Sequence, residues 1–352
     1  MSRRPNRRAE PDARHALVLQ GGGALGAYEL GVLERLYGEP AFVPAYISGV
    51  SIGAITAAVL VGARNGDPIG TLKTLWESLV VRSSHLVPQP FEPALSMFGN
   101  PAFYRMRGDY LNMAFWTSLY DLAPIRAQLA ELVDFDAIMA SPIRLVVTAT
   151  NVRSGEIATF SNTDPENPIT LDHILASGSL PPGFPMTAIG DDLYWDGGLF
   201  DNTPLSPLLG LIDANDAPHT RLFVVNLFPK TGEPPRNMIG VSDRMIELIF
   251  ANKMHDDVKM ATTINRFVAL VDEILTHHPE VRHLFDRPEF NQLARYKALD
   301  DIVEITNTRD EPANAASDFS RHAIEARIDA GRRDADRALK DQRRRLSERT
   351  AA

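Results

Sequence analysis

The chain has 352 residues, 44% hydrophobic and 23% charged, and is therefore long enough to bury the core of one large domain or of two modest ones. Its formal net charge of −9 argues against general nucleic-acid binding, because a phosphate-binding surface needs an excess of cations. The absence of cysteine excludes disulfide bonds and thiolate metal sites.

Residues 1–14 predict a disordered basic tail, with contact to an anionic lipid surface as the weaker alternative. No apolar run of signal-peptide length follows the tail. The longest apolar stretch, 52–63, falls well below the ~20 residues that a membrane span needs. We therefore expect a cytoplasmic protein whose contact with a membrane surface is at most transient and peripheral.

The next segments alternate between strands and helices. A continuous apolar run ending in glycines predicts a buried parallel strand, and apolar residues at helical spacing predict the helices between such strands. The expected elements are a strand at 15–20, a helix at 26–37, a strand at 44–50, a helix at 52–66 and later strands at 143–148 and 221–227. This order is typical of a layered α/β domain with a parallel sheet.

The glycine-rich loop QGGGALG at 20–26 has two interpretations. Gly21, Gly23 and Gly26 fit the GxGxxG spacing of a dinucleotide-binding loop, while the same backbone suits an oxyanion formed during ester cleavage. A dinucleotide-binding fold ends its second strand with an acidic residue for the ribose hydroxyls. Here the second strand runs into SGVSIGAI with no carboxylate near its end, so we reject the cofactor interpretation.

That second strand leads into a GxSxG motif formed by Gly49, Ser51 and Gly53. A serine at a sharp strand-to-helix turn holds strained backbone angles, and small neighbours two residues to either side relieve the crowding. The N-terminus of the following helix adds a positive dipole near the hydroxyl. A tight turn with an idle serine is the alternative, but the glycine-rich loop just before it favours a nucleophile.

A serine nucleophile needs a base, usually a histidine oriented by a carboxylate. None of the nine histidines has the loop setting of a catalytic base, and His173 falls in an expected helix on the core side. Asp196, in LYWDGGLF, is more conspicuous because Gly197 and Gly198 behind it leave access to a tight site. The local sequence alone does not separate this role from an ordinary Asp-Gly turn.

Three motifs in this order, GGGALG, GVSIG and WDGG, resemble those of the patatin-like phospholipases. The segment ILASGSLPPGFP before the last motif is also similar to a variable segment of that family. The resemblance covers 16–205 and implies a three-layer α/β/α fold with a mainly parallel sheet. It also implies a Ser–Asp dyad, in which Ser51 is the nucleophile and Asp196 is the general base with no histidine between them.

The same resemblance assigns an oxyanion hole to backbone N–H groups of the glycine loop. The residues concerned are Gly21, Gly22 and Gly23. Preorganised donors of this kind stabilise the developing charge by roughly 3 kcal/mol each, and glycine lets the backbone approach the substrate. The family usually has Arg or Lys where this chain has Leu25. That departure indicates either a preference for a neutral ester or compensation by a distant arginine such as Arg105 or Arg107.

The segment 81–120 carries many methionine and aromatic residues among prolines and glycines. Such residues in irregular backbone suit a flexible cover over an acyl-binding groove, so we interpret the segment as a lid or acyl channel. A loop packed as ordinary core is an almost equally good interpretation.

The catalytic domain is expected to span 15–230, followed by a mostly helical extension at 231–350. Within the extension we expect a helix that covers 238–267 and ends near 268–275, a strand at 301–307 and a charged amphipathic helix at 318–345. The last of these is similar to the extension of a bacterial subgroup of the family. Its mixed charges favour docking on the catalytic domain or pairing in a homo-oligomer over binding to a membrane.

Two classes of function follow. The first is a serine acyl hydrolase that cleaves lipid carboxylic esters through an acyl-enzyme, with a lipid or other acyl ester as its substrate. The second is a non-catalytic acyl- or lipid-binding protein acting through its C-terminal helices; the intact motifs favour the enzyme. No cofactor or metal is implied, and no loop has calcium-ligand spacing. Phospholipase A, lysophospholipase, neutral-lipid esterase and polyester or thioester hydrolase are not separated by these residues.

Overall fold

The computed structural model of the chain describes residues 14–81, 99–213, 215–228 and 238–285. It also describes 302–309 and 315–351, with the short pieces 234–235, 287–288, 290 and 311. Residues 1–13 of the expected tail and 82–98 of the expected lid lie outside the described residues.

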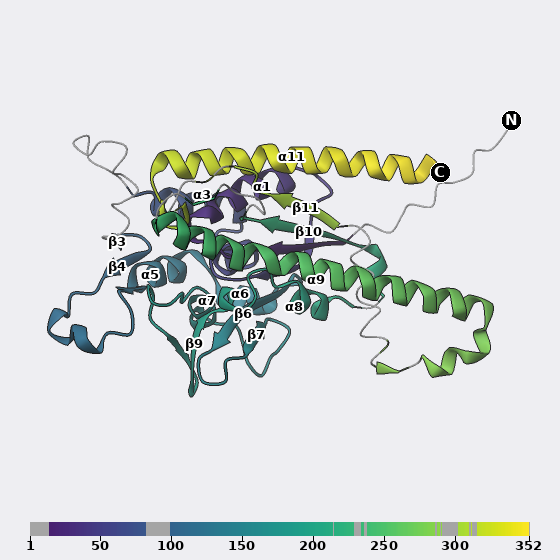
Figure 1. The fold of residues 1–352 in the computed structure, drawn as a ribbon, viewed down its shortest axis with the longest axis horizontal. Helices are drawn as coiled ribbons and strands as arrows, with labels where there is room; N and C mark the ends of the chain where they lie inside the picture. The colour runs from purple at the N-terminus through teal and green to yellow at the C-terminus, as the bar shows by residue number, and fades with distance from the viewer. Residues whose placement is uncertain are drawn as a thin grey trace.

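A sheet of eight strands forms the centre of the fold, in the order β11-β10-β1-β2-β6-β9-β8 with β7 also paired to β6 (Figure 1). The strands are β1 Arg14–Leu19, β2 Pro44–Gly49, β6 Arg144–Asn151, β7 Ile157–Ser161, β8 Thr187–Ile189, β9 Asp192–Asp196, β10 Thr220–Asn226 and β11 Ile302–Thr306. The five strands from β11 to β6 are parallel, whereas β7 and β9 run antiparallel to β6, and β8 to β9. The predicted mainly parallel α/β sheet is therefore confirmed.

Helices cover both faces of this sheet. They are α1 Ala27–Tyr37, α2 Ile52–Gly62, α3 Pro68–Leu79, α5 Ala123–Leu132, α6 Phe135–Ala140, α7 Leu171–Ser177, α8 Leu205–Leu211, α9 Met238–His277 and α11 Arg321–Ala351. Alternate residues of β1 enter two different cores. Leu17 and Leu19 join the core under α1, α2 and α11, whereas Ala16 and Val18 join the core under α8. The strand is apolar on both faces because both faces are covered.

Most elements expected from the sequence lie within a few residues of their predicted bounds, but one helix differs at its end. The helix expected at 52–66 ends at Gly62, and Gly66 instead takes a φ of 71° in the turn before α3. The helix expected to end near 268–275 ends at His277. The antiparallel strand β7 was not predicted, because it is short and largely exposed and lacks the apolar run of the parallel strands.

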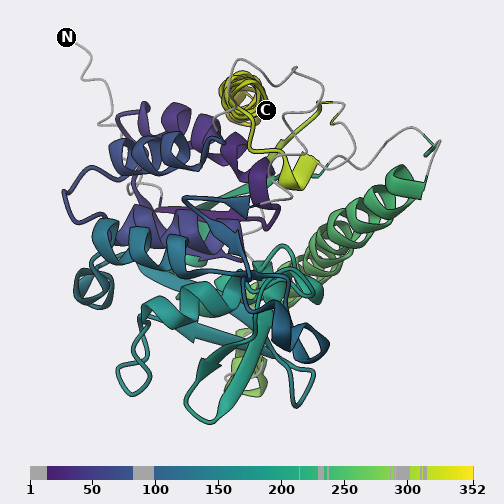
Figure 2. The same ribbon diagram turned by 90° about the vertical axis from the view of Figure 1, so that its left-hand side faces the viewer.

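The last helix docks on the body of the protein, which is one of the two options that its mixed charges favoured. α11 lies along α1 and contributes Ile324, Ala335 and Leu339 to the main core (Figure 1). Figure 2 shows α11 end-on, outside the layer that contains α1. The preceding strand β11 is hydrogen-bonded to β10. The extension thus shares a core and a sheet with the first part of the chain, and the expected boundary at 230 stays a prediction.

The other long helix, α9, leaves several apolar side chains exposed, including Met260, Phe267 and Leu270. Pairing of two chains through the C-terminal helices stays a prediction. Within the ranges that the structure describes, no helix combines the length and apolar character needed to cross a bilayer.

A small antiparallel sheet forms the described part of the expected lid. It consists of β3 Gly99–Asn100, β4 Tyr104–Met106 and β5 Tyr120–Asp121, with the 3₁₀ helix η4 Tyr110–Phe115 between β4 and β5. Tyr104 and Tyr120 pack on each other and on Phe184, with ring centroids 4.8 to 6.2 Å apart. The base of this segment is therefore packed as core, whereas η4 has no buried residue.

The contact between α1 and α11 depends on two glycines. A Cβ at Gly331 would overlap the carbonyl oxygen of Tyr28, and a Cβ at Gly31 would overlap that of Ile328. The Tyr28 hydroxyl also donates a hydrogen bond to Asp334 at 3.1 Å. The two helix backbones touch directly, which only residues without a Cβ allow.

Gly331→Ala is expected to lower the free energy of unfolding by about 1–3 kcal/mol, because the added methyl group pushes the two helices apart. Denaturant unfolding followed by circular dichroism measures the change. Gly210→Ala in α8 is the matched control, since a Cβ there would meet nothing within 4 Å. If Gly331→Ala were as stable as the Gly210→Ala variant, the helices would not be in backbone contact.

Candidate active site

Ser51 occupies the turn between β2 and α2. Its φ of 55° and ψ of −124° make it the only non-glycine residue with a positive φ in the part of the chain that the structure describes. A serine holds such angles only where its surroundings enforce them. One enforcing contact is a hydrogen bond from the Ser51 N–H to the hydroxyl oxygen of Ser177, at 3.0 Å. The turn therefore has the geometry expected of a nucleophile elbow.

The glycines around this turn are required by close backbone contacts. A Cβ at Gly49 would overlap the carbonyl oxygen of Gly53, and a Cβ at Gly53 would lie 2.5 Å from the carbonyl oxygen of Leu19. A Cβ at Gly26 would lie 2.6 Å from Cγ1 of Ile52. The turn and the glycine loop can approach each other only because these positions carry no side chain.

The register of the sheet brings Asp196 level with Ser51. Gly49 pairs with Val147 of β6, so Ser51, two residues further on, reaches the level of Ala149. Asp196 at the end of β9 pairs with Ala149 on the same edge of β6, because β7 occupies the other edge along both stretches. β2 and β9 therefore run toward each other along one edge of β6, and the ends of these two strands bring Ser51 and Asp196, distant in sequence, together.

The Ser51 hydroxyl donates a hydrogen bond directly to the carboxylate of Asp196, whose side chain is buried. A second donor is the Gly198 N–H, which lies 2.7 Å from Oδ1. Burial raises the pKa of Asp196 to about 7, and the two hydrogen bonds limit this rise because they favour the charged form. The carboxyl group therefore changes charge near neutral pH.

The backbone of Asp196 is fixed as firmly as its side chain. The Thr150 hydroxyl donates to the carbonyl oxygen of Asp196 at 3.0 Å. A Cβ at Gly197 would lie 2.6 Å from the carbonyl oxygen of Thr148, and a Cβ at Gly198 would lie 3.1 Å from Oδ1 of Asp196. The WDGG turn is thus packed too closely for side chains after the aspartate.

The loop after β1 carries three consecutive glycines, and the first of them, Gly21, lies beside Ser51. A Cβ at Gly21 would lie only 2.9 Å from Cβ of Ser51. The amide of Asn202 donates to the carbonyl oxygen of Gly21 at 2.9 Å and holds the start of the loop. Gly22 precedes the 3₁₀ helix η1, Gly23–Gly26, and Gly23 has a φ of 55°. The loop therefore runs past the nucleophile candidate and carries no side chain of its own from Gly21 to Gly23.

Two positioning side chains were not singled out from the sequence. Ser177 accepts the N–H of Ser51, and Asn202 holds Gly21. Each acts through a single hydrogen bond between distant segments, which no spacing in the sequence marks. The available signal was that both lie inside motif segments, ILASGSL and DGGLFDNTP.

His173 is a structural residue, as predicted. It is buried in the first turn of α7, where Nδ1 accepts the Thr170 N–H at 3.0 Å and the ring packs on Phe160. Burial lowers the pKa of His173 and keeps the ring neutral. In the described part of the chain, no group of three or more His, Asp or Glu side chains is arranged to hold a metal ion.

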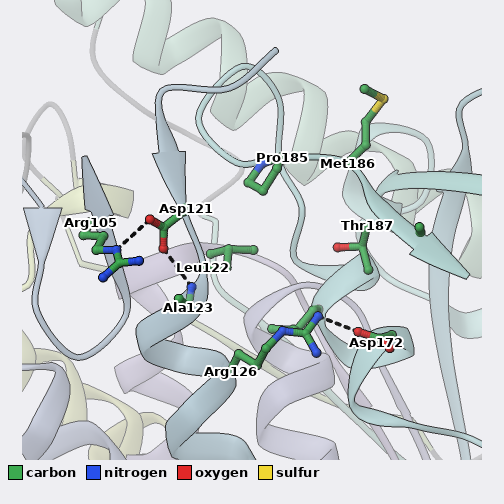
Figure 3. Close-up of a pocket in the computed structure, with 11 residues that line it drawn as sticks. Arg105, Asp121, Leu122, Ala123, Arg126, Asp172, Pro185, Met186 and Thr187 are labelled. Carbon is green, nitrogen blue, oxygen red and sulfur yellow. Dashed lines mark hydrogen bonds and ion pairs between the residues drawn. The ribbon is translucent and has the colours of Figure 1, made fainter. Parts of the chain in front are cut away.

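A pocket of about 530 Å³ lies between α5, α7 and β8 (Figure 3). The ion pairs Arg105–Asp121 and Arg126–Asp172 frame it. Thr187 on its wall shares a hydrogen bond of 2.8 Å with the Ser179 hydroxyl, and the Ser179 carbonyl accepts the N–H of Asp196. Neither Ser51 nor Asp196 lines this pocket, and its link to them is the chain of hydrogen bonds through Ser179.

Fold and site define an α/β protein with a strained serine, a buried carboxylate in contact with it and a glycine loop alongside. A model of the patatin-like phospholipase family matches residues 17–209, and a second family model, described as patatin phospholipase, matches 248–350. The chain belongs to the patatin-like phospholipase family. No curated protein matches it. Among solved structures it is similar to VipD from Legionella pneumophila, with 16% identity and a TM-score of 0.45 over 95% of this chain and 68% of that chain.

Asp196→Asn is expected to make the protein more stable above neutral pH. The pKa of the folded state, about 7, exceeds the ordinary value of 3.8, so wild-type stability falls as the pH rises from about 4 to about 7 and stays low above that. Asparagine does not titrate, and the gain at about pH 8 is on the order of 4 kcal/mol at most.

Denaturant unfolding at about pH 5 and about pH 8 measures this difference. Asp191→Asn, at an exposed position in the preceding turn, is the control and should behave like the wild type at both values. The buried-carboxylate account would be wrong if Asp196→Asn were destabilised equally at both.

Proposed function

We propose that the protein is a serine acyl hydrolase of lipid carboxylic esters, with Ser51 as nucleophile and Asp196 as general base. The observation that carries this proposal is the direct hydrogen bond from a serine hydroxyl, held at a strained turn, to a buried carboxylate. Membership of the patatin-like phospholipase family supports the lipid acyl hydrolase class.

In the proposed reaction, Asp196 takes the hydroxyl proton as the Ser51 oxygen attacks the ester carbonyl carbon. Negative charge develops on the carbonyl oxygen, and N–H groups of Gly21, Gly22 and Gly23 stabilise it. The intermediate collapses to an acyl-enzyme, and the alcohol leaves with the proton from Asp196. Water then attacks the acyl group with the same carboxylate as base, which releases the acid and restores Ser51.

The electrostatics of Asp196 suit this role. An ordinary aspartate is too weak a base to accept a serine proton effectively, and a catalytic base works best with a pKa near the operating pH. Burial raises the pKa of Asp196 to about 7, while the Gly198 N–H keeps the carboxylate oriented. The positive end of α2 lies at Ser51 and favours the developing alkoxide.

Ester hydrolysis measured across pH tests the dyad. We expect kcat/KM to rise about tenfold per pH unit below about 7 and to level off above it, because only the carboxylate form of Asp196 accepts the proton. The substrates are nitrophenyl esters of increasing chain length, phosphatidylcholine, phosphatidylglycerol and a neutral glyceride. Ser51→Ala should lose at least ~10³-fold, as removal of a nucleophile does in serine hydrolases.

Ser154→Ala, in an exposed turn, is the matched control and should retain full activity. A pH profile that is flat around 7, or substantial activity in Asp196→Asn, would point to another base. Absence of both hydrolysis and fluorophosphonate labelling at Ser51 would instead favour the non-catalytic acyl-binding alternative. The relative rates of hydrolysis of the charged and neutral lipids show whether this chain, with Leu25 in its glycine motif, prefers neutral esters.

We further propose that η4 makes the contact with the lipid surface. All six of its residues are exposed, and four of them are large and hydrophobic. Leu111 and Phe115 are the most exposed of these four, at 102% and 85%; the others are Tyr110 and Met113. Figure 1 shows this blue loop between β4 and β5 projecting at the lower left, beyond the body of the molecule. Apolar side chains exposed together at a projecting tip suit insertion into a lipid interface.

The base of the loop is hydrogen-bonded to the segment that follows α7. The Tyr120 N–H donates to the carbonyl oxygen of Gly183 at 2.9 Å, in the segment that connects α7 to β8. Arg107 pairs with Asp109 at 2.7 Å and lies over the ring of Trp116. Aromatic residues beside an arginine are typical of the membrane–water interface. The loop therefore suits the delivery of lipid to a nearby site.

The double variant Leu111→Ser/Phe115→Ser is expected to bind phosphatidylcholine vesicles at least about tenfold more weakly, because each lost apolar side chain removes ~1.5–3 kcal/mol of burial. Vesicle flotation measures the binding, and hydrolysis of a soluble short-chain ester should be unchanged. Val43→Ser, which removes an exposed apolar side chain elsewhere, is the control. Equal vesicle binding by the double variant and the control would refute the η4 contact.

A further inference from the structure

A buried arginine of the C-terminal helix lies against the glycine motif. Arg327 of α11 has no exposed side-chain surface. Its Nη1 donates to the carbonyl oxygen of Asp318 at 2.8 Å and reaches that of Ala24 at 3.4 Å. Nε and Nη2 both donate to Oε2 of Glu311, at 3.3 and 3.1 Å. One guanidinium thus connects a carboxylate of the extension, the start of α11 and the glycine motif.

The segment just before α11 touches the same motif at two more points. The 3₁₀ helix η9, Ala315–Ser317, lies against Gly23, where a Cβ would overlap the carbonyl oxygen of Ala316. Phe319 stacks on Trp76, and Trp76 in turn would lie 3.2 Å from a Cβ at Gly26. Both ends of η1 are therefore enclosed by residues of the extension or by residues packed on it.

Arg327 also bears on the position of Leu25, where the family usually has Arg or Lys. That side chain is buried in the main core and carries no charge to the motif. Arg105 and Arg107, the candidates from the sequence, are instead ion-paired with carboxylates of the segment around the small sheet. Arg327 instead contacts the motif, at the carbonyl oxygen of Ala24 beside Leu25. This cation comes from the other end of the chain.

We infer that Arg327 is a positioning residue for the oxyanion loop, an inference that rests on the proposed function. Glu311 neutralises the guanidinium, so its effect is geometric: it holds the Ala24 carbonyl and with it the peptide planes from Gly22 to Ala24. N–H donors stabilise a transition state only if their directions are fixed beforehand. In this chain the C-terminal extension fixes them, in place of a basic residue within the motif.

Two variants test the inference without leaving a buried charge unpaired. Arg327→Lys keeps the charge but removes the planar fork that joins three acceptors. Arg327→Gln/Glu311→Gln removes both members of the buried ion pair at similar volume. Arg309, which also pairs with Glu311, has a side chain that is 30% exposed, so its charge stays in contact with water in this variant. Arg332→Gln is the matched control, because Arg332 lies on the same helix, is half exposed and pairs with Glu34 of α1.

The first readout is kcat on a soluble nitrophenyl ester. The rate is divided by the concentration of reactive sites, which is measured by titration with a fluorophosphonate. Both Arg327 variants should lose about 10- to 100-fold in kcat, the cost of a displacement of about 1 Å in catalytic groups, with KM changed less than about threefold. Arg332→Gln should equal the wild type. Counting per reactive site removes any loss that comes only from a smaller folded fraction.

The second readout is hydrogen exchange of the amides at 21–27, which does not require activity. These amides should exchange at least about tenfold faster in both Arg327 variants and unchanged in Arg332→Gln. If the wild type neither hydrolyses nor labels, the proposed function fails, and exchange alone decides the positioning role. Wild-type exchange in this loop overturns the inference whatever the melting temperature, as does wild-type kcat per site in an active enzyme.

Discussion

The hydrogen bond between the Ser51 hydroxyl and the buried carboxylate of Asp196 is the constraint on which the rest of the structure depends. A direct contact between these two side chains leaves no room for an intervening group, so the strands that carry them must match in register. β2 and β9 pair with successive stretches of one edge of β6 and run toward each other, so that their carboxyl ends meet at the same level along it. A slip of one residue in either pairing would turn a side chain to the other face and separate the pair.

This contact is held against two unfavourable terms, a positive φ at Ser51 and a carboxylate removed from water at Asp196. Each is offset by a hydrogen bond: the Ser51 N–H donates to the Ser177 hydroxyl oxygen, and the Gly198 N–H donates to the Asp196 carboxylate. The glycines around the site have a related cause, because Gly49, Gly53 and Gly197 lie against backbone carbonyl oxygens of neighbouring segments. A raised pKa at Asp196 is thus a consequence of burial that a catalytic base can use.

The parts of this arrangement that are local in sequence were predictable. The elbow, the WDGG turn and the parallel strands each leave a pattern of a few residues, because glycine spacing and apolar runs reflect backbone geometry directly. β7 was missed because an exposed antiparallel strand needs no apolar run. Asn202 and Ser177 were missed because each position is set by one hydrogen bond to a distant segment. The assignment of Asp196 needed the resemblance of this chain to the patatin-like family, since the local sequence around Asp196 fits a simple turn equally well.

The extension was expected to dock on the first part of the chain or to pair with a second chain, and in the structure it shares the sheet and the main core of the first part. β11 covers the edge of β10, which would otherwise present unpaired backbone groups. α11 covers α1 through a contact that requires glycine on both helices. The two family matches, 17–209 and 248–350, therefore meet in one sheet and one core. Because Arg327 comes from the second match and touches Ala24 in the first, the geometry of the glycine loop depends on residues at both ends of the chain.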